Sequence, residues 1–237
     1  MKNLKSRELS FDDFRNLAVN PKLTRNQKID FPESYRHGYT KAILADIVHK
    51  LQLTHKKRQI ICDIGCGCGD LMLATSSWAK IHHNTLLLVD SKEMLSQVPN
   101  APYIRKFAGK FPDIPALYKH YRQSCQAVLC YSVIQYVYGQ GDIFRFIQKA
   151  LDLIKVNGLL LLGDIPNEDK RNRFLKTPEG RTFVGAKRDR TGKMSDAVIL
   201  KILMRFRRLG YETYLVPHPS GLPMANRRED IIIVKRI

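Results

Sequence analysis

The sequence of 237 residues predicts an α/β protein built on one doubly wound, mostly parallel sheet of seven strands. Short, wholly apolar runs alternate with segments of helical periodicity, and the first of these runs enters a glycine-rich turn. Strands that are covered by helices on both faces read as continuous apolar stretches, which is typical of parallel sheets. With 44% apolar and 26% charged residues, the composition is that of a globular chain with one main core.

The first 58 residues are expected to form a helical extension that acts as a lid on a main domain over residues 59–237. Within the extension, residues 34–52 place apolar side chains at helical spacing, which predicts a helix. The main domain opens with residues 59–64, QIICDI, a short apolar run that predicts a buried strand.

The later elements follow the same alternation. Further buried strands are expected at 85–90, 102–107, 127–131 and 159–164, and helices at 70–80, 142–156 and about 195–209. Two last strands, 211–216 and 231–236, are joined by a loop that is too short for a helical crossover. They are therefore expected to be antiparallel to each other.

Positive charge is concentrated outside the middle of the chain. The formal net charge is +18, of which residues 1–58 carry +7, residues 59–165 only +2 and residues 166–237 +9. The densest basic run lies within an insertion at about 166–194 that is broken by glycines and expected to be irregular. A basic excess of this size indicates an anionic partner, either a small anionic molecule or a nucleic acid.

Other features of the composition narrow the class of protein. No apolar stretch approaches the roughly 20 residues that span a bilayer, and the sequence MKNLKSRELSFDDF has no apolar segment of a secretion signal. Five cysteines, an odd number with three inside residues 62–68, fit free thiols and a cytoplasmic location. Their spacing is not that of a zinc knuckle, so no metal site is expected.

The glycine-rich turn, DIGCGCGD at 63–70, follows a buried strand and precedes a helix. A dinucleotide fingerprint would need a third glycine at position 70, but that residue is Asp70. The carboxylates of Asp63 and Asp70 would together repel a pyrophosphate. Asp90 ends the second strand, where a carboxylate can accept hydrogen bonds from both hydroxyls of a ribose. The pattern favours S-adenosylmethionine, which is cationic and has no phosphate. The alternatives are a plain tight turn for the glycines and a helix N-cap for Asp90.

These motifs resemble those of class I S-adenosylmethionine-dependent methyltransferases, whose sheet is Rossmann-like with an antiparallel last strand. The matching pieces are ICDIGCGCGD at 61–70, VD at 89–90, AGKFPD at 108–113, VLCYSVIQYV at 128–137 and GDIPN at 163–167. The resemblance implies that the turn holds the methionine end of the cofactor, Asp90 the ribose, and the loop after the third strand the adenine. The residues expected to bind the cofactor are Asp63, Gly65, Cys66, Gly67, Asp90, Ser91, Ala108, Gly109, Lys110, Tyr131, Ser132 and Val133.

Methyl transfer from a sulfonium is an in-line displacement in which a base helps a hydroxyl or ammonium acceptor. Asp164, after the fifth strand, and His37, in the lid, are the candidate catalytic residues, with helix capping and simple surface exposure as the respective alternatives. The residues expected to bind the acceptor are Tyr35, Arg36, Gln135, Tyr136 and Arg227. For an arginine the alternative is a solvated surface charge, and for residues 133–137 a role in the core.

The flanking segments, FPESYRHGY at 31–39, DIPNEDKRNRF at 164–174 and LPMANRREDIIIVKR at 222–236, look similar to methyltransferases of bacterial surface-sugar biosynthesis. That looser resemblance implies a sugar or nucleotide-sugar acceptor, whose phosphate suits the arginine fork. Two alternatives stay open: methylation of RNA through the basic flanks, and an inactive scaffold that binds the cofactor.

Overall fold

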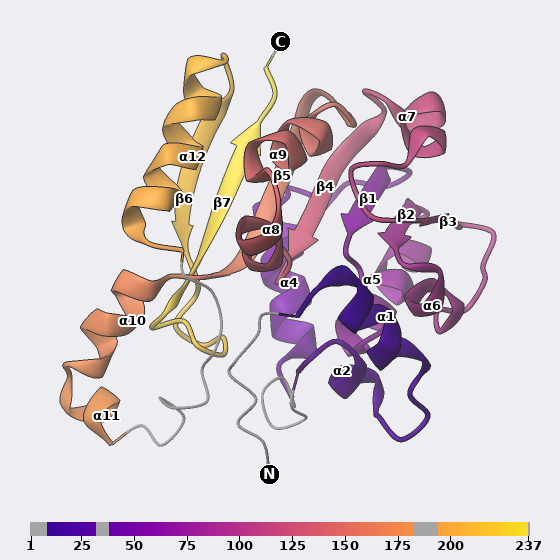
Figure 1. The fold of residues 1–237 in the computed structure, drawn as a ribbon. Coiled ribbons are helices and arrows are strands. Elements are labelled where there is room, and N and C mark those ends of the chain that lie inside the picture. Colours follow the sequence, from indigo (N-terminus) through magenta and orange to yellow (C-terminus); the bar gives the residue numbers. More distant parts are fainter. Residues whose placement is uncertain (1–8, 32–37, 183–193, 237) are drawn as a thin grey trace.

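The computed structural model describes residues 9–31, 38–182 and 194–236, and its centre is one sheet of seven strands (Figure 1). The strand order is β3-β2-β1-β4-β5-β7-β6. The strands are β1 Ile60–Ile64, β2 Thr85–Asp90, β3 Ile104–Ala108, β4 Cys125–Tyr131, β5 Ile154–Pro166, β6 Glu212–Pro217 and β7 Arg228–Val234.

The pairing of the strands confirms the predicted fold class. The first five strands are parallel to one another, whereas β7 runs antiparallel to both β5 and β6. Because the carboxyl ends of parallel strands meet at one edge, the loops after β1, β2, β3, β4 and β5 all open on the same side of the molecule.

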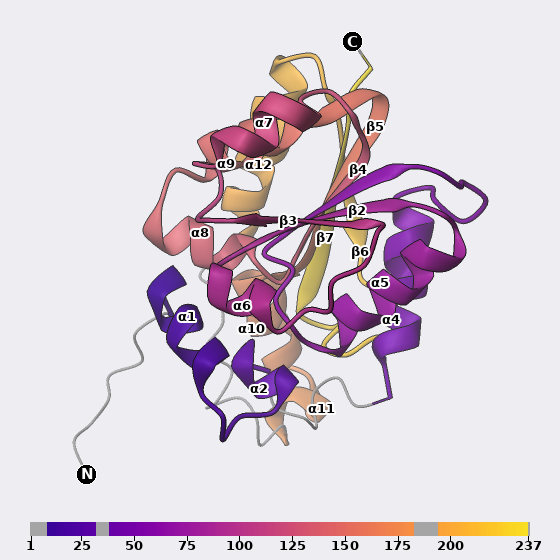
Figure 2. The same cartoon turned by 90° about the vertical axis from the view of Figure 1, so that its right-hand side faces the viewer.

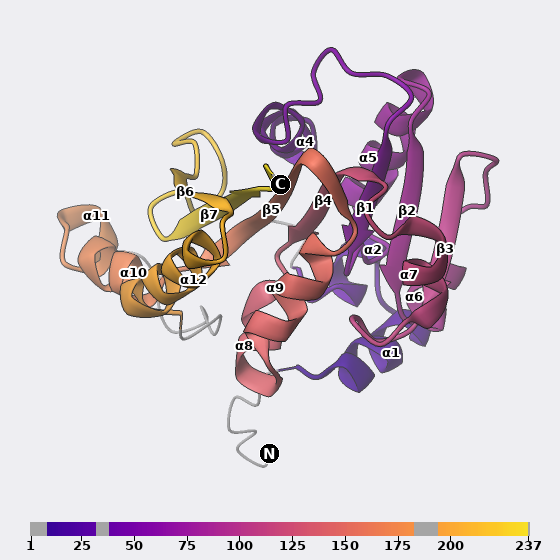
Figure 3. The same cartoon turned by 90° about the horizontal axis from the view of Figure 1, so that it is seen from above.

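Helices cover both faces of the sheet. Figure 3 shows α4 and α5 on one side of the strands and α9 and α12 on the other. The helices are α1 Phe11–Val19, α2 Arg25–Lys28, α4 Thr40–Lys50, α5 Asp70–Ile81, α6 Lys92–Ser96, α7 Pro115–Tyr121, α8 Ile134–Gln140, α9 Ile143–Leu151, α10 Glu168–Leu175, α11 Pro178–Arg181 and α12 Asp196–Arg208.

Strand β2 illustrates why the central strands are apolar at most positions. Leu86 and Leu88 pack into the cluster beneath α4 and α5, while Leu87 and Val89 pack into the cluster beneath α7, α9 and α12. Successive side chains of a strand point to opposite faces. A strand between two helical layers therefore needs an apolar residue at every position, which is the pattern on which the prediction rested.

Some boundaries differ from those predicted. The helix predicted at 142–156 ends at Leu151, because Ile154 pairs with Cys125 at the start of a much longer β5. Near the start of β5, a Cβ on Gly158 would lie 2.8 Å from the carbonyl oxygen of Gln126, so a residue without a side chain is needed there. The insertion predicted to be irregular begins with two helices, α10 and α11, and β7 begins at Arg228 instead of residue 231.

Helices α1 and α2, with the segments around them, form the part called here the N-terminal cap, residues 9–31. Figures 1 and 2 both place these helices at the edge of the sheet where the parallel strands end. In α1, Ser10 and Asp13 form a reciprocal capping box, which fixes the start of the helix. Within the described ranges, no helix has the length and apolar character needed to cross a membrane.

Candidate functional site

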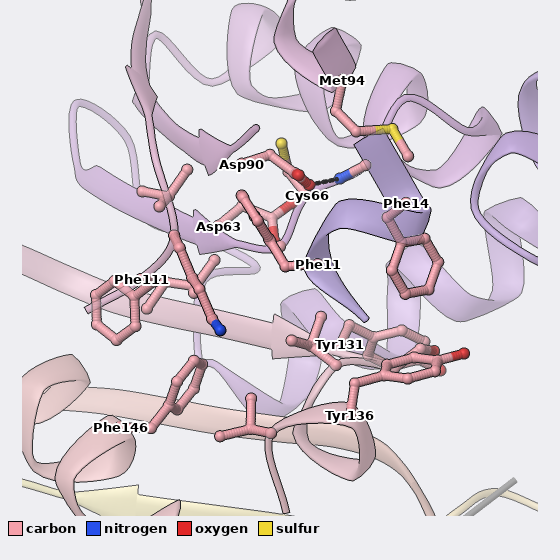
Figure 4. A pocket seen from close by; sticks show the side chains of 18 of the residues that line it. Phe11, Phe14, Asp63, Cys66, Asp90, Met94, Phe111, Tyr131, Tyr136 and Phe146 are labelled. Carbon is pink, nitrogen blue, oxygen red and sulfur yellow. Dashed lines mark hydrogen bonds between the residues drawn. The ribbon is translucent and has the colours of Figure 1, made fainter. Parts of the chain in front are cut away.

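A cavity of about 350 Å³ opens at the carboxyl ends of the parallel strands, beneath the cap (Figure 4). Its polar wall is formed by the turn after β1 and by the end of β2. Its apolar wall combines aliphatic and aromatic side chains. The aromatic residues that line it are Phe11, Phe14, Phe31, Phe111, Tyr131, Tyr136 and Phe146.

The turn after β1 requires glycine at two positions. Gly65 and Gly67 have φ values of +71° and +61°, a backbone conformation that residues other than glycine rarely adopt. A Cβ on Gly65 would also lie 2.6 Å from Cγ2 of Val133. The predicted tight turn is therefore present, and its residues Gly65, Cys66 and Gly67 line the cavity.

Asp90 holds this turn in place. Its Oδ2 accepts a hydrogen bond from the N–H of Gly67 at 2.8 Å, and its Oδ1 accepts one from the N–H of Ser91 at 2.7 Å. Burial raises the pKa of Asp90 to about 6, although both amides act to lower it. The N-cap of α6 is Ser91, whose hydroxyl accepts from the N–H of Met94, so Asp90 is not the capping residue.

Asp63 is the second acidic residue of the cavity, and its side chain is 6% exposed. Burial, with a smaller contribution from the charge of Asp90, raises the pKa of Asp63 to about 7. Within the described ranges no lysine, arginine or histidine forms an ion pair with either carboxylate. Two buried carboxylates without a cation are costly, so this wall suits a positively charged ligand that donates hydrogen bonds.

The loop after β3 closes one end of the cavity. Gly109 and Lys110 line it, and the N–H of Gly109 donates to the carbonyl oxygen of Asp90 at 2.9 Å. Ala108, predicted with them, is paired with Asp90 inside the sheet and is not among the lining residues. At the rim, Arg145 and Asp113 form an exposed ion pair at 2.6 Å.

The segment after β4 closes the other end. Tyr131, Ser132, Val133 and Tyr136 line the cavity, as does Cys66 across from them. Gln135, predicted to bind the acceptor, is buried and donates from Nε2 to the carbonyl oxygen of Ser132, so its side chain supports the wall from behind.

The cap contributes residues that the sequence analysis did not single out. Positions Gly67 and Gly69 approach Ile29 so closely that a Cβ on either would lie within 2.7 Å of it. Phe14 stacks edge-on against Tyr136 with ring centroids 5.0 Å apart, and both point into the cavity region (Figure 4). The sequence contains one indication of this contribution of the cap. The capping box at Ser10 implies a helix, and that helix carries Phe14 on one face.

The structure places Asp164 beneath the cavity wall, at 3% exposure and outside the lining. Its Oδ2 accepts a hydrogen bond from the hydroxyl of Ser132. The helix after Pro166 is capped by Asn167, so capping is not the role of Asp164. Arg227 is buried over the ring of Phe174, also outside the lining. Tyr35, Arg36 and His37 lie outside the described residues.

Asp164 belongs to a group of ionisable residues, called here the ionic cluster, most of which are buried. Lys50 contacts Asp46 at 2.6 Å and Asp230 at 2.5 Å. Asp230 also faces His218 at 3.3 Å, and its Oδ1 accepts from the N–H of Asp164 at 2.7 Å. The members of the cluster are Asp46, Lys50, Asp164, His218, Arg228 and Asp230.

Metal ligation has no support in the described part of the chain, which holds no group of three or more histidine, cysteine or acidic side chains arranged around a metal position. Four of the five cysteines are buried, and Cys66 alone is half-buried. The Cys66 thiol has its pKa raised well above the ordinary value by burial, followed by the charge of Asp90.

Comparisons with known proteins bear on the fold. A search against protein-family models finds no match, and a search of the curated proteins finds none either. Solved structures of the same fold are numerous. In the complex of the Haloferax volcanii Trm112 methyltransferase activator with a methyltransferase, the similar chain has a TM-score of 0.61 and 14% identity, covering 98% of this chain and 100% of that chain.

Two further structures give the same result. The plantazolicin methyltransferase in complex with S-adenosylhomocysteine and a triazolic analogue has a TM-score of 0.62 and 11% identity, covering 96% of this chain and 98% of that chain. An S-adenosylmethionine-dependent methyltransferase of Methanococcus maripaludis has a TM-score of 0.56 and 17% identity, covering 100% of this chain and 98% of that chain. The chain is thus similar to class I methyltransferases in fold.

Proposed function

We propose that this protein is an S-adenosylmethionine-dependent methyltransferase. The observation that carries the proposal is the pair of buried carboxylates, Asp63 and Asp90, beside a glycine turn at the carboxyl edge of a sheet of this topology. The cofactor has a sulfonium, an ammonium and a ribose with two free hydroxyls, and it lacks the phosphates that such a wall repels.

The order of strands supports one orientation of the ligand. Gly109 and Lys110 would flank the adenine, Asp90 at the end of β2 would receive the ribose hydroxyls, and Asp63 at the end of β1 would face the methionine end. A dinucleotide fits less well, since Asp70 occupies the start of α5 and its Oδ2 accepts a hydrogen bond from Nδ2 of Asn26 at 2.9 Å. A pyrophosphate at that helix terminus would face this carboxylate.

When bound, the cofactor supplies an electrophilic methyl group on a good neutral leaving group. The chain orients the acceptor, and proximity supplies much of the rate. Asp164 and His37 are proposed as proton acceptors. Because Asp164 lies behind Ser132, it receives the acceptor's proton only through the serine: the acceptor proton moves to Ser132 Oγ while the serine proton moves to Asp164 Oδ2.

For the acceptor, we propose a small anionic molecule, a sugar or nucleotide-sugar derivative. Its support is the basic excess, which lies in the segments before residue 59 and after residue 165. Within the described ranges, Lys110 and Arg145 line the cavity as cations, and Tyr136 offers a hydroxyl. Tyr35 and Arg36 are proposed as further acceptor-binding residues, and Gln135 and Arg227, which lie behind the lining, would contribute by supporting the wall of the site. RNA is the second candidate, favoured by the net charge of +18.

A thermal-shift assay with S-adenosylhomocysteine, NAD and ADP as separate ligands tests the cofactor class. We expect a raised melting temperature with S-adenosylhomocysteine alone; a shift with NAD and none with S-adenosylhomocysteine contradicts the proposal. The acceptor is tested with S-adenosylmethionine carrying a labelled methyl group, offered with nucleotide-sugars or with total RNA. Label in the sugar fraction supports the proposed acceptor, label in RNA alone overturns it, and no label in either supports the inactive scaffold.

A further inference from the structure

Helix α5, which follows the glycine turn, begins without a capping side chain of its own. Its N-cap residue is Gly69, which offers no side-chain acceptor to the first turn of the helix. The first N–H groups of a helix have no partner within it, and a capping side chain usually accepts from them. The start of α5 comes directly after Gly65, Cys66 and Gly67, which line the cavity. The way in which this helix start is held therefore bears on the proposed cofactor site.

The missing cap is supplied by Asn26 of α2, 44 residues earlier in the chain than Asp70. Oδ1 of Asn26 accepts a hydrogen bond from the N–H of Asp70 at 3.3 Å, and Nδ2 of Asn26 donates to Oδ2 of Asp70 at 2.9 Å. A Cβ on Gly69 would lie 3.1 Å from Oδ1 of Asn26, so the amide lies close over the N-cap position. The amide of Asn26 is buried, and it pairs with both the backbone and the side chain of one residue, which fixes its orientation.

Packing joins the cap to the same segment. Nη1 of Arg25 donates to the carbonyl oxygen of Cys68 at 3.4 Å. Cys68 is itself wholly buried, in a small apolar cluster that contains Met94 and has Ile29 packed against it. This cluster is separate from the two apolar clusters that flank the sheet. The cap and the end of the glycine turn thus share a core of their own.

The glycine turn is held from two sides, by Asp90 and by the cap. Asp90 accepts from the N–H of Gly67, and Asn26 holds Asp70 three residues later. We propose that Asn26 is a positioning residue for the cofactor site, and that docking of the cap and binding of the cofactor stabilise each other. The coupling is reciprocal: a cap that holds the turn in its binding conformation raises the affinity for the ligand, and the bound ligand strengthens the docking of the cap by the same factor. This inference rests on the proposed function.

An exchange of the two side chains tests the role of Asn26. Neither Asn26 nor Asp70 is among the residues that line the cavity, so the contacts of the ligand itself are kept. Asn26→Asp places two carboxylates face to face, and the affinity for S-adenosylhomocysteine should fall about tenfold. In the double variant with Asp70→Asn, both hydrogen bonds can form again with donor and acceptor exchanged, and the affinity should return to within about twofold of the wild-type value. An unchanged affinity in Asn26→Asp, or no recovery in the double variant, overturns the inference.

A second capping residue separates positioning from a purely structural role. Ser195 caps α12, where its hydroxyl accepts from the N–H of Val198 at 3.4 Å, and α12 packs beside β6 at the outer edge of the sheet. Ser195→Ala and Asn26→Ala should both lower the melting temperature. In titrations well below that temperature, Ser195→Ala should keep the affinity for S-adenosylhomocysteine, and Asn26→Ala should lower it about fivefold. Equal affinities of the two variants would contradict the positioning role.

Hydrogen exchange of the wild-type protein tests the reciprocal effect without any substitution. The residues of α2, Arg25–Lys28, are not among those that line the cavity. Saturating S-adenosylhomocysteine should nevertheless slow the exchange of their amides about fivefold or more, because the ligand strengthens the docking of the cap. Slower exchange in residues 65–70 with unchanged exchange in α2 overturns the coupling. Failure of the wild-type protein to bind S-adenosylhomocysteine would count against the proposed function instead.

Discussion

Two pairs of buried carboxylates lie at the same edge of the sheet, and their surroundings differ. Asp63 and Asp90, at the ends of β1 and β2, face the cavity, and burial raises their pKa values to about 7 and about 6. Asp164 and Asp230, on β5 and β7, lie in the ionic cluster. Burial acts to raise the pKa of Asp230 too, but His218 and Lys50 hold it below the ordinary value.

The difference separates two uses of the same side chain. A buried carboxylate with cationic partners is compensated within the protein, and it stabilises one arrangement of the strands around it. A buried carboxylate that faces a cavity without such a partner is compensated by a ligand. On this ground we propose that the pair on β1 and β2 binds the ligand and that the pair on β5 and β7 supports the cavity wall, with Asp164 also the proposed proton acceptor behind Ser132.

The largest expected effect is the loss of a cation from the ionic cluster. Lys50→Met leaves Asp46 and Asp230 buried without their lysine, which should lower the free energy of unfolding by ~3–5 kcal/mol. Urea denaturation measures this change. Lys149→Met, which removes an exposed lysine paired with Asp152, is the control and should cost less than ~1 kcal/mol. Equal effects of the two variants would mean that the cluster is not compensated as described.

A smaller but specific effect is expected in the glycine turn. Gly65→Ala adds a methyl group at φ +71° and against Val133, so the turn must shift and the affinity for S-adenosylhomocysteine should fall about tenfold or more. Gly221→Ala, where nothing lies within 4 Å of the new Cβ, should leave the affinity unchanged. Isothermal titration calorimetry of both variants with S-adenosylhomocysteine measures this difference in affinity. An unchanged affinity in Gly65→Ala would place the ligand away from this turn.

The pH dependence distinguishes the two pairs further. A carboxylate with a raised pKa contributes stability below the ordinary pKa of about 4 and loses it as pH rises through about 7, where Asp63 ionises. Asp63→Asn should therefore raise the melting temperature at about pH 8, change it little at about pH 5, and weaken ligand binding. In the wild-type protein, the affinity for S-adenosylhomocysteine should fall several-fold as pH drops from about 8 to about 5.5. A pH-independent affinity would contradict the role of these carboxylates.

The smallest effect is expected at the outer contact of the cap. Arg15 and Glu93 form an ion pair at 2.8 Å on the surface, where the arginine and its hydrogen bonds lower the pKa of Glu93 to about 2. Exposed pairs contribute little because water and salt screen them. The melting temperature of Arg15→Ala should match that of the wild-type protein, and a drop of several degrees would show that the cap depends on this contact.

The fold was predictable because the central strands of the sheet are visible in the sequence as short apolar runs. The buried strands are apolar at consecutive positions, as in Leu86 to Val89, and no tertiary information is needed to see this. The end of the helix after Asp142 was predicted wrongly, because residues 152–156 continue its apolar pattern and only the partner strand, through Cys125, draws Ile154 into β5. Such a competition between local pattern and pairing is decided by contacts distant in sequence.

The same holds for the site. Asp63, Gly65, Gly67 and Asp90 could be predicted because they adjoin the strands in a fixed local pattern. The contribution of the cap could not, since Ile29 reaches the glycine turn across nearly 40 residues of chain and carries no motif. The position of Asp164 behind Ser132 was also hidden, because it depends on the backbone after β4, on the irregularity within β5 between Leu162 and Ile165, and on Arg228.

Calorimetric titration of S-adenosylhomocysteine into the wild-type protein, Asp90→Ala and Glu212→Ala tests the central claim most directly. The account predicts one molecule bound per chain and an affinity lower by about 30-fold or more in Asp90→Ala, because two hydrogen bonds to a charged group are lost. Glu212→Ala, on the distant strand β6, should bind as the wild-type protein does. No binding to the wild-type protein at about 1 mM ligand, or the same affinity in Asp90→Ala, would contradict the account.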